Sequence, residues 1–357
     1  MKKLLVVCLG LVVVTGILGY SFRISLTRSF LSWWLLESVQ TSEWDTLPDG
    51  LHVALCGAGS PLPDPKRVGP CVAVLAGERL FIVDAGAGGV RNFRGMGLRP
   101  DNIEAILLTH FHSDHIDGLG EMLLQRWATG GSVRPTPVFG PTGVEQIVRG
   151  INQVYALDAV YRAAHHGEET MPLSGRGAKA QSFAIPAQGD GITVIDEQGL
   201  TITAFRVDHA PVTAAVGYRF DYKGRSLLIS GDTAKSSNLT AFAQGVDLLV
   251  HEALDPSLVL LLNRVYREAG RRNLSRITAD IPAYHTSPIE AAEIARDAGV
   301  QALLFYHIIP PLLLPTMHEI FLEGVEEIYS GVVVVGQDGT LMSLPAGSAE
   351  VNQMELL

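Results

Sequence analysis

The pattern H-x-H-x-D-H places four potential metal ligands within six residues: His110, His112, Asp114 and His115. It follows directly on the apolar segment 104–108, whose lack of polar alternation predicts a strand that is buried on both faces. Side chains alternate along an extended chain, so His110 and His112 point the same way and can bind one metal. Asp114 and His115, where the chain turns toward a helix, can face a second metal. The spacing therefore predicts a two-metal site.

Three further candidate ligands lie far apart in the sequence, each at or just after the end of an apolar strand. They are His209, Asp232 in a Ser-Gly-Asp-Thr run, and His307. Ligand sites in layered α/β proteins gather at such strand ends. Each residue alone has an ordinary structural explanation, but together the three complete a ligand set for two metals.

The elements that must position these residues are predicted from periodicity and turn residues. The predicted strands are 51–57, 71–77, 79–86, 104–110, 135–141, 191–195, 200–209, 214–222, 225–233, 246–253, 301–307, 331–336 and 340–345. The predicted helices are 118–130, 143–162, 236–244, 256–272 and 288–299, and 163–190 is a predicted loop insertion. Strand runs mixed with β-α units predict an α/β fold in which two sheets lie between outer helices.

Composition is that of a folded domain. Hydrophobic residues make up 47% and charged residues 18% of the 357 residues. The formal net charge of -10 argues against a broad basic surface for nucleic acid, because phosphate contacts need clustered Lys and Arg. It leaves room for a small anionic substrate, since bound metal ions supply local positive charge.

Between about residues 51 and 311 the sequence resembles the metallo-β-lactamase superfamily and, within it, the ribonuclease Z and arylsulfatase-like branch. The motifs are LCGAGSPLPDPKRVGPC, IVDAGAG, LLTHFHSDHIDGL, VDHAPVTAAVGYRF, LLISGDT, LLVHEAL, YHTSPIEAA and FYHIIPP. The resemblance implies a four-layer αβ/βα sandwich and two zinc ions per chain. One zinc is expected on His110, His112 and His209, the other on Asp114, His115 and His307, with Asp232 bridging both. Manganese or iron at the second site would suit the same ligands.

The resemblance also implies a mechanism in which a hydroxide shared by two metals attacks an ester. The candidate catalytic residues are Asp114, His285 and Glu252, with His285 donating a proton to the leaving alkoxide. A carboxylate raises the pKa of a neighbouring imidazole, so Glu252 would orient and charge His285. The alternative is that His285 is a loop-surface residue and Glu252 a helix cap. Asp84 is expected to hold the metal loop by hydrogen bonds.

The sequence departs from ribonuclease Z in ways that favour a different substrate. The long arm for tRNA is missing, because the strand ending at residue 222 meets the next across Lys223-Gly224. The leading hypothesis is therefore a hydrolase of phosphate or sulfate esters, acting on a small or moderate anionic ester, with nucleic acid unlikely as a partner. The alternatives are a lactonase or β-lactamase-type ring-opening hydrolase, a tRNA 3′ endonuclease, and a non-catalytic binding module. The resemblance suggests a homodimer.

The N-terminus predicts membrane attachment. Lys2 and Lys3 precede the apolar run 4–20, which predicts a transmembrane anchor over 1–22, with a cleaved signal as the alternative. Residues 23–45 are a predicted interfacial helix or linker that carries Trp33 and Trp34. The hydrolase domain is predicted over 46–347, outside the cytoplasm, and 348–357 is a C-terminal tail. Cys56 and Cys71 could pair if that region faces an oxidising compartment, and could equally remain free.

Overall fold

The computed structural model describes residues 19–36 and 42–357, and the chain divides into two compact units, Met1–Thr46 and Leu47–Leu357. In the first unit, residues 19–36 are helical and a 3-10 helix, η1, spans Glu43–Thr46. Within the described part of the chain, no helix is long and apolar enough to cross a membrane. The predicted transmembrane anchor therefore gains no support, and most of it, 1–18, lies outside the described residues.

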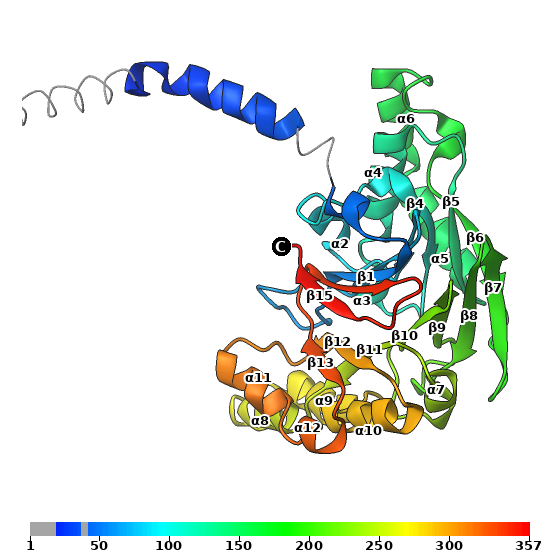
Figure 1. The fold of residues 1–357 in the computed structure, drawn as a ribbon, viewed down its shortest axis with the longest axis vertical. Coiled ribbons are helices and arrows are strands. Elements are labelled where there is room, and N and C mark those ends of the chain that lie inside the picture. Colours follow the sequence, from blue (N-terminus) through cyan, green and yellow to red (C-terminus); the bar gives the residue numbers. More distant parts are fainter. Residues whose placement is uncertain (1–18, 37–41) are drawn as a thin grey trace, which may run out of the picture. The chain divides into compact units, whose positions relative to one another are not determined.

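The second unit is built on two sheets that face each other (Figure 1). The first has the order β15-β14-β1-β2-β3-β4-β5-β6 and the second the order β13-β12-β11-β10-β9-β8-β7. The strands of the first sheet are β1 (Gly50–Gly57), β2 (Cys71–Ala76), β3 (Arg79–Val83), β4 (Ile103–Leu107), β5 (Thr136–Pro141), β6 (Ala178–Phe183), β14 (Thr340–Pro345) and β15 (Asn352–Glu355). Those of the second are β7 (Gly191–Glu197), β8 (Leu200–Arg206), β9 (Val216–Tyr222), β10 (Arg225–Ile229), β11 (Leu248–Leu254), β12 (Ala302–Ile309) and β13 (Val332–Val335).

Helices cover the outer face of each sheet, which confirms the predicted two-sheet α/β fold. The first half carries α2 (Gly89–Asn92), η2 (Pro100–Asn102), α3 (Ser113–Ile116), α4 (Leu119–Gly130), α5 (Val144–Val154), α6 (Ala156–His166) and η3 (Leu173–Gly175). The second half carries α7 (Ser237–Phe242), α8 (Pro256–Glu268), α9 (Arg272–Asp280), η4 (Ile281–Ala283), α10 (Pro288–Ala298), α11 (Pro315–Phe321) and α12 (Val325–Ile328). One buried apolar cluster lies between the sheets, and a second lies between the second sheet and its helices. Burial of both clusters is the main favourable contribution to folding.

Several predicted elements differ from the observed ones. The predicted helix 143–162 is two helices, α5 and α6, which meet at Tyr155. The predicted loop 163–190 contains β6, a half-exposed edge strand whose polar sequence, AKAQSF, carries no apolar signal. The predicted helix 256–272 ends at Glu268, and α9 follows it. The predicted tail contains β15, which pairs with β14. These elements form through long-range pairing and packing, which override local pattern.

The two cysteines left open by the sequence form a disulfide. Cys56 lies at the end of β1 and Cys71 begins β2, with their Cα atoms 5.0 Å apart and both side chains fully buried. The bond closes the Gly/Pro-rich loop 57–70 at its base.

The ends of several strands converge at one edge of the two sheets. β10, β11 and β12 are parallel, so their carboxyl ends lie together. Two hydrogen bonds tie the segment after β4 to the second sheet. The Tyr218 hydroxyl donates to the Leu108 carbonyl at 2.8 Å, and the Val216 N–H donates to the Thr109 carbonyl at 3.0 Å. Residues from both sheets therefore meet at this edge.

Candidate metal centre

The loop after β4 is held by a buried carboxylate. Asp84, which follows β3, accepts hydrogen bonds from the Thr109 N–H at 2.8 Å and the Thr109 hydroxyl at 2.7 Å. Its Oδ2 also lies 2.8 Å from Nδ1 of His115. Asp84 has a positive φ of 58°, a conformation that non-glycine residues adopt only when their surroundings enforce it. The carboxylate thus fixes the loop and one imidazole at once, as the sequence leads us to expect.

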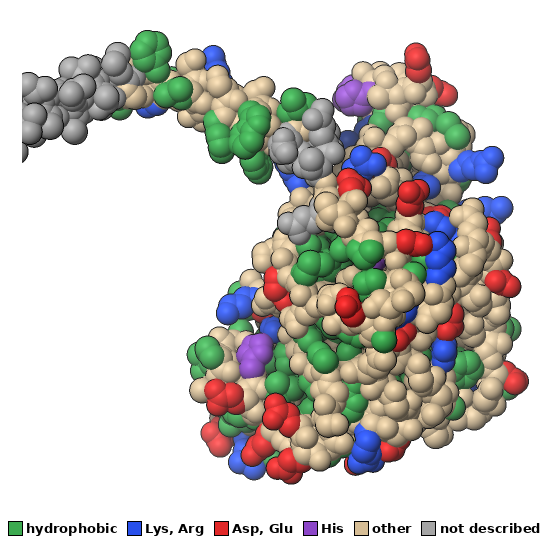
Figure 2. All heavy atoms as spheres, viewed as in Figure 1, with side chains coloured by type: hydrophobic (Ala, Val, Ile, Leu, Met, Phe, Trp, Pro, Cys, Tyr) green, Lys and Arg blue, Asp and Glu red, His purple; other side chains and the backbone are tan. Residues whose placement is uncertain are grey.

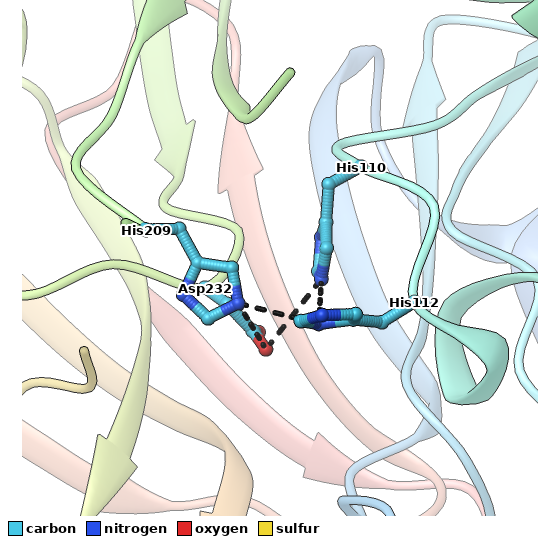
Figure 3. Close-up of side chains that lie close together, drawn as sticks. All are labelled: His110, His112, His209 and Asp232. Atoms are coloured by element: carbon cyan, nitrogen blue, oxygen red, sulfur yellow. Dashed lines mark hydrogen bonds and ion pairs between the residues drawn. The ribbon is translucent and has the colours of Figure 1, made fainter. Parts of the chain in front are cut away.

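Three imidazoles and one carboxylate form the first group of possible ligands. Figure 3 shows His110, His112 and His209 turned toward Asp232. Ring nitrogens of His110 and His112 lie 2.9 Å apart, and those of His112 and His209 lie 3.3 Å apart. One ligand atom from each of the four residues lies within 4.8 Å of the others. Although β4 ends at Leu107, the extended backbone at His112 keeps the two histidines on the same side.

Asp114, His115 and His307 form the second group, again with ligand atoms within 4.8 Å of one another. Nε2 of His307 lies 3.2 Å from Oδ2 of Asp114, and Nε2 of His115 lies 3.5 Å from the same oxygen. Asp232 reaches both groups. Its Oδ1 is 3.3 Å from His115, and its Oδ2 is 3.4 Å from His307 and 3.8 Å from His110. Asp232 therefore lies between the two groups, as expected for a residue that would bridge two metals.

His307 owes its orientation to an irregularity in the sheet. Glu252 pairs with Tyr306 and Ala253 pairs with Ile308, so His307 is an extra residue between two pairs of β11 and β12. It has a positive φ of 47°. Bulges re-aim side chains and occur next to functional sites. The strained bulge thus turns His307 out of the strand alternation and toward Asp114.

The donor set fits a bound cation. Nε2 of His115 and Oδ1 of Asp232 are buried and have no hydrogen-bond partner, and burying such atoms unsatisfied is costly. Burial lowers the pKa of His110, His112 and His209, which favours the neutral imidazole that binds metal. Burial would also lower the pKa of His115, but the charges of Asp232 and Asp84 outweigh it and raise that pKa well above the usual value. The carboxylates of Asp232 and Asp84 therefore favour a positive charge at the position of His115.

A second pair of residues, His285 and Glu252, lies against this cluster. Oε1 of Glu252 lies 3.0 Å from Nδ1 of His285 and accepts hydrogen bonds from the Thr233 and Thr286 N–H groups, each at 3.1 Å. Glu252 is fully buried, and the His285 ring stacks on that of His307 with centroids 5.7 Å apart. Neither residue is at the surface, so the loop-surface and helix-cap alternatives for this pair do not hold.

The charge of His285 is set by its partner. Burial alone would lower the pKa of His285, but the charge and hydrogen bond of Glu252 outweigh it and raise that pKa to about 9. The imidazolium is then the dominant form at neutral pH. A ring nitrogen of His285 lies within 4.8 Å of ligand atoms of Asp232 and His307. The geometry is that of a proton donor beside the cluster.

The fold thus brings together all nine site residues that the sequence predicted. It also adds Thr109 and Tyr284, which the sequence analysis did not single out. Thr109 Oγ1 lies 3.1 Å from Nδ1 of His110, and the Tyr284 carbonyl lies 3.0 Å from Nδ1 of His209. Such partners orient metal-binding imidazoles. In the sequence, the only signal for these two residues was their position next to His110 and His285. The contact of Tyr284 is made by its backbone carbonyl, which the residue type does not reveal.

Comparison with known proteins identifies the class. Residues 79–308 match the family model described as the β-lactamase superfamily domain. The chain is 34% identical over 291 residues to ribonuclease Z of Mycobacterium bovis (strain BCG / Pasteur 1173P2), covering 81% of this chain and 96% of that protein. It is 35% identical over 264 residues to ribonuclease Z of Mycolicibacterium gilvum (strain PYR-GCK), covering 73% of this chain and 85% of that protein.

Solved structures share the fold. Human tRNase Z, short form, matches with a TM-score of 0.58 and 20% identity over 82% of this chain and 99% of that chain. The metallo-β-lactamase fold protein YhfI from Bacillus subtilis matches with a TM-score of 0.59 and 19% identity over 83% of this chain and 100% of that chain. The chain belongs to the metallo-β-lactamase superfamily and, within it, to the ribonuclease Z family. It is therefore a metal-dependent hydrolase acting on ester bonds, as predicted.

The comparisons also correct the sequence-based predictions. The hydrolase of small phosphate or sulfate esters, the arylsulfatase-like assignment and the exclusion of nucleic acid are wrong, because the curated relatives are ribonucleases Z. The net charge was a poor guide to nucleic-acid binding because it is summed over the whole chain, whereas a substrate contacts only part of the surface. The prediction of a membrane-anchored protein with its domain outside the cytoplasm is contradicted by the same relatives, and the residues that the structure describes contain no helix able to span a membrane.

Proposed function

We propose that this chain is a zinc-dependent endoribonuclease of the ribonuclease Z type, which hydrolyses a phosphodiester bond on the 3′ side of precursor tRNA. One observation carries the proposal. A two-group ligand cluster lies beside the buried His285–Glu252 pair, in a chain that matches ribonuclease Z over 96% of that protein's length. The ligand cluster is suited to hydrolysis of a phosphate ester. The acid, His285, can protonate a poor leaving group such as a ribose alkoxide.

The residues that would hold two zinc ions are the two groups described above. His110, His112 and His209 form one set, Asp114, His115 and His307 form the other, and Asp232 serves both. Imidazole nitrogen and carboxylate oxygen are common zinc ligands. Bound there, the metals would polarise the phosphate and lower the pKa of a water molecule. Asp114 has a further role in holding His307 in place, through their 3.2 Å contact.

The protein's own contribution to bond breaking is a proton. Water gives up one proton to solvent, and the resulting hydroxide oxygen joins phosphorus. The bond from phosphorus to the leaving ribose oxygen then breaks, and the leaving oxygen keeps the electron pair as an alkoxide. The His285 imidazolium transfers its proton to this alkoxide, which leaves as a hydroxyl group. Glu252 stabilises the imidazolium, while the Thr233 and Thr286 N–H groups fix the carboxylate.

The missing arm does not remove this chemistry. β9 and β10 join through the tight turn Lys223-Gly224, so the strand connection holds no arm. The absence bears on how RNA is held, whereas the reaction depends on the cluster and the acid. The similarity to ribonuclease Z is therefore stronger evidence about the substrate than the missing arm.

The test uses the full chain, its metal content and two substrates. A 3′-extended tRNA transcript has an alkoxide leaving group, and bis(p-nitrophenyl) phosphate has a good one. We expect two zinc ions per chain and cleavage of both substrates, with RNA cleavage much weaker in His285→Asn. Hydrolysis of the small diester with no cleavage of the transcript, or of other structured RNAs, would contradict the proposal. A His165→Asn variant, at the exposed end of α6, is the matched control.

A further inference from the structure

The segment between Glu252 and His285 folds into a helical hairpin with an unusual charge. The α8–α9 hairpin, residues 256–280, contains five of the chain's 27 Lys and Arg residues: Arg264, Arg267, Arg271, Arg272 and Arg276. Its only acidic residues are Glu268 and Asp280. In a chain of net charge -10 this is a local excess of positive charge.

The arginines are exposed and mostly unpaired. All five are exposed, and only Arg276 forms an ion pair, at 2.9 Å to Asp280. Within the described part of the chain, the guanidinium groups of the other four have no carboxylate or hydrogen-bond partner. Arginines that support a fold pair with carboxylates or carbonyls, as Arg225 does through Asp247. The four on the hairpin have no such structural role.

The hairpin is rigid and rooted at the site. Asn263 on α8 donates hydrogen bonds to the Ser275 carbonyl at 2.5 Å and to the Thr278 hydroxyl at 3.1 Å, which locks the helices together. At the base, the Asp255 N–H donates to the carbonyl of Ile309, two residues beyond His307. From this base, the 13 residues of α8 span about 20 Å.

A second pair of helices provides the contrast. The α5–α6 pair, residues 144–166, lies on the other half of the domain, and α6 projects from its body (Figure 1). The pair has two arginines and two acidic residues, and Arg162 pairs with Asp158 at 2.7 Å. On the face drawn in Figure 2, acidic and basic side chains are interspersed. The excess of arginine is thus a property of the hairpin beside the site, and charge complementarity indicates an anionic partner there.

We propose that the α8–α9 hairpin binds the phosphate backbone of the RNA substrate and holds it over the metal cluster. The inference rests on the proposed function, and it names the surface that does this work in a chain without an arm between β9 and β10. Arg264 and Arg267 lie on α8, and Arg271 and Arg272 lie at the turn and the start of α9, so a strand running along the hairpin meets several guanidiniums in succession. The exposed Leu260 and Leu261 beside them offer apolar contact to bases.

An RNA strand fits these observations better than a lipid surface. An interfacial helix gathers its apolar residues on one face and its cations on the other. Here the exposed apolar side chains lie among the arginines on both helices: Leu260, Leu261 and Val265 near Arg264 and Arg267 on α8, and Ile277 next to Arg276 on α9. A backbone with regularly spaced phosphates satisfies that arrangement.

The experiment measures RNA binding separately from cleavage. A fluorescent 3′-extended tRNA is titrated with the full chain carrying His285→Asn, which slows cleavage and leaves the ligand set intact, with and without Arg264→Gln, Arg267→Gln, Arg271→Gln and Arg272→Gln. We expect the four changes to raise the Kd about tenfold or more and to flatten its dependence on salt, by about 0.7 in the log–log slope for each lost contact. The matched control is Arg134→Gln with Arg149→Gln, two exposed arginines away from the α8–α9 hairpin.

Five outcomes distinguish the alternatives. A Kd that rises in the hairpin variant and not in the control supports the inference. Equal RNA affinity in both overturns it, as does failure of the parent protein to bind RNA. Loss of binding to phosphatidylglycerol vesicles with unchanged RNA affinity overturns it in favour of a lipid surface. If the active chain hydrolyses bis(p-nitrophenyl) phosphate but no RNA, the proposed function fails, while the Kd comparison still judges the hairpin.

Discussion

The candidate ligands come from two regions of the molecule, and these regions are assembled in opposite ways. Four of the seven candidate ligands come from residues 110–115, on one loop after β4 of the first sheet. The other three, His209, Asp232 and His307, come from three separate connections or strands of the second sheet. The four loop ligands need only a local turn held by Asp84, whereas the other three need β10, β11 and β12 in correct parallel register.

This difference predicts how many of the two metals a single substitution should affect. A substitution of one loop ligand should disturb mainly the metal that this ligand would bind, because each loop ligand serves only one of the two groups. A substitution at Asp232 should affect both metals, because among the described residues only this carboxylate lies within 4 Å of histidines of both groups. The predictions below test this contrast.

The largest effect is expected from Asp232→Ala. Removal of the shared carboxylate should reduce bound zinc below one ion per chain and lower the rate on both substrates by about 10³-fold or more. Metal analysis and steady-state rates measure this. Retention of two zinc ions would show that the two groups do not depend on a shared carboxylate, which would break the comparison.

Next in size is His285→Asn, which removes the proton donor and leaves the ligand set intact. We expect RNA cleavage to fall by about 10²- to 10⁴-fold, the usual contribution of a general acid. Hydrolysis of bis(p-nitrophenyl) phosphate, whose leaving group needs no proton, should fall far less, with unchanged zinc content. Equal losses on the two substrates would point to a role for His285 in metal binding.

A smaller effect is expected from Asp84→Asn. Asparagine tolerates the positive φ of this position, so the change tests the charge and not the backbone. Loss of the charged partner of His115 should weaken zinc binding by about 10- to 100-fold. Competition with a chelator measures this affinity, and a loss confined to one of two zinc ions would sharpen the contrast between the groups.

The smallest effect concerns pH in the metal-free protein. The pKa of His285 is about 9, raised from 6.5, so its pairing with Glu252 contributes stability that is complete below pH 6.5. That contribution is lost as pH rises through about 9. NMR titration of the His285 ring and the free energy of unfolding between pH 6.5 and 9 both report it. A midpoint near 6.5, or a pH dependence that persists in Glu252→Gln, would contradict the assignment.

Much of the candidate site could be predicted from the sequence because the candidate ligands are of only two residue types, histidine and aspartate. The H-x-H-x-D-H run follows from local geometry, and His209 and Asp232 each follow an apolar strand. The two-sheet core followed from hydrophobic patterning, which depends on solvent exclusion and not on exact pairing. The edge strand β6 and the division of 143–162 into α5 and α6 were not predictable in this way, because both depend on contacts with distant segments.

By itself, the sequence determined the metal-binding residue types, their order along the chain and the two-layer sheet core. Only the tertiary structure decided how they meet. The bulge at His307 arises from the pairing of β11 with β12, and the charge of His285 arises from its contact with Glu252, 33 residues away in the sequence. The exposure of the hairpin arginines likewise depends on which faces of α8 and α9 pack inward. Register, burial and exposure are relations between distant segments, and a linear pattern does not contain them.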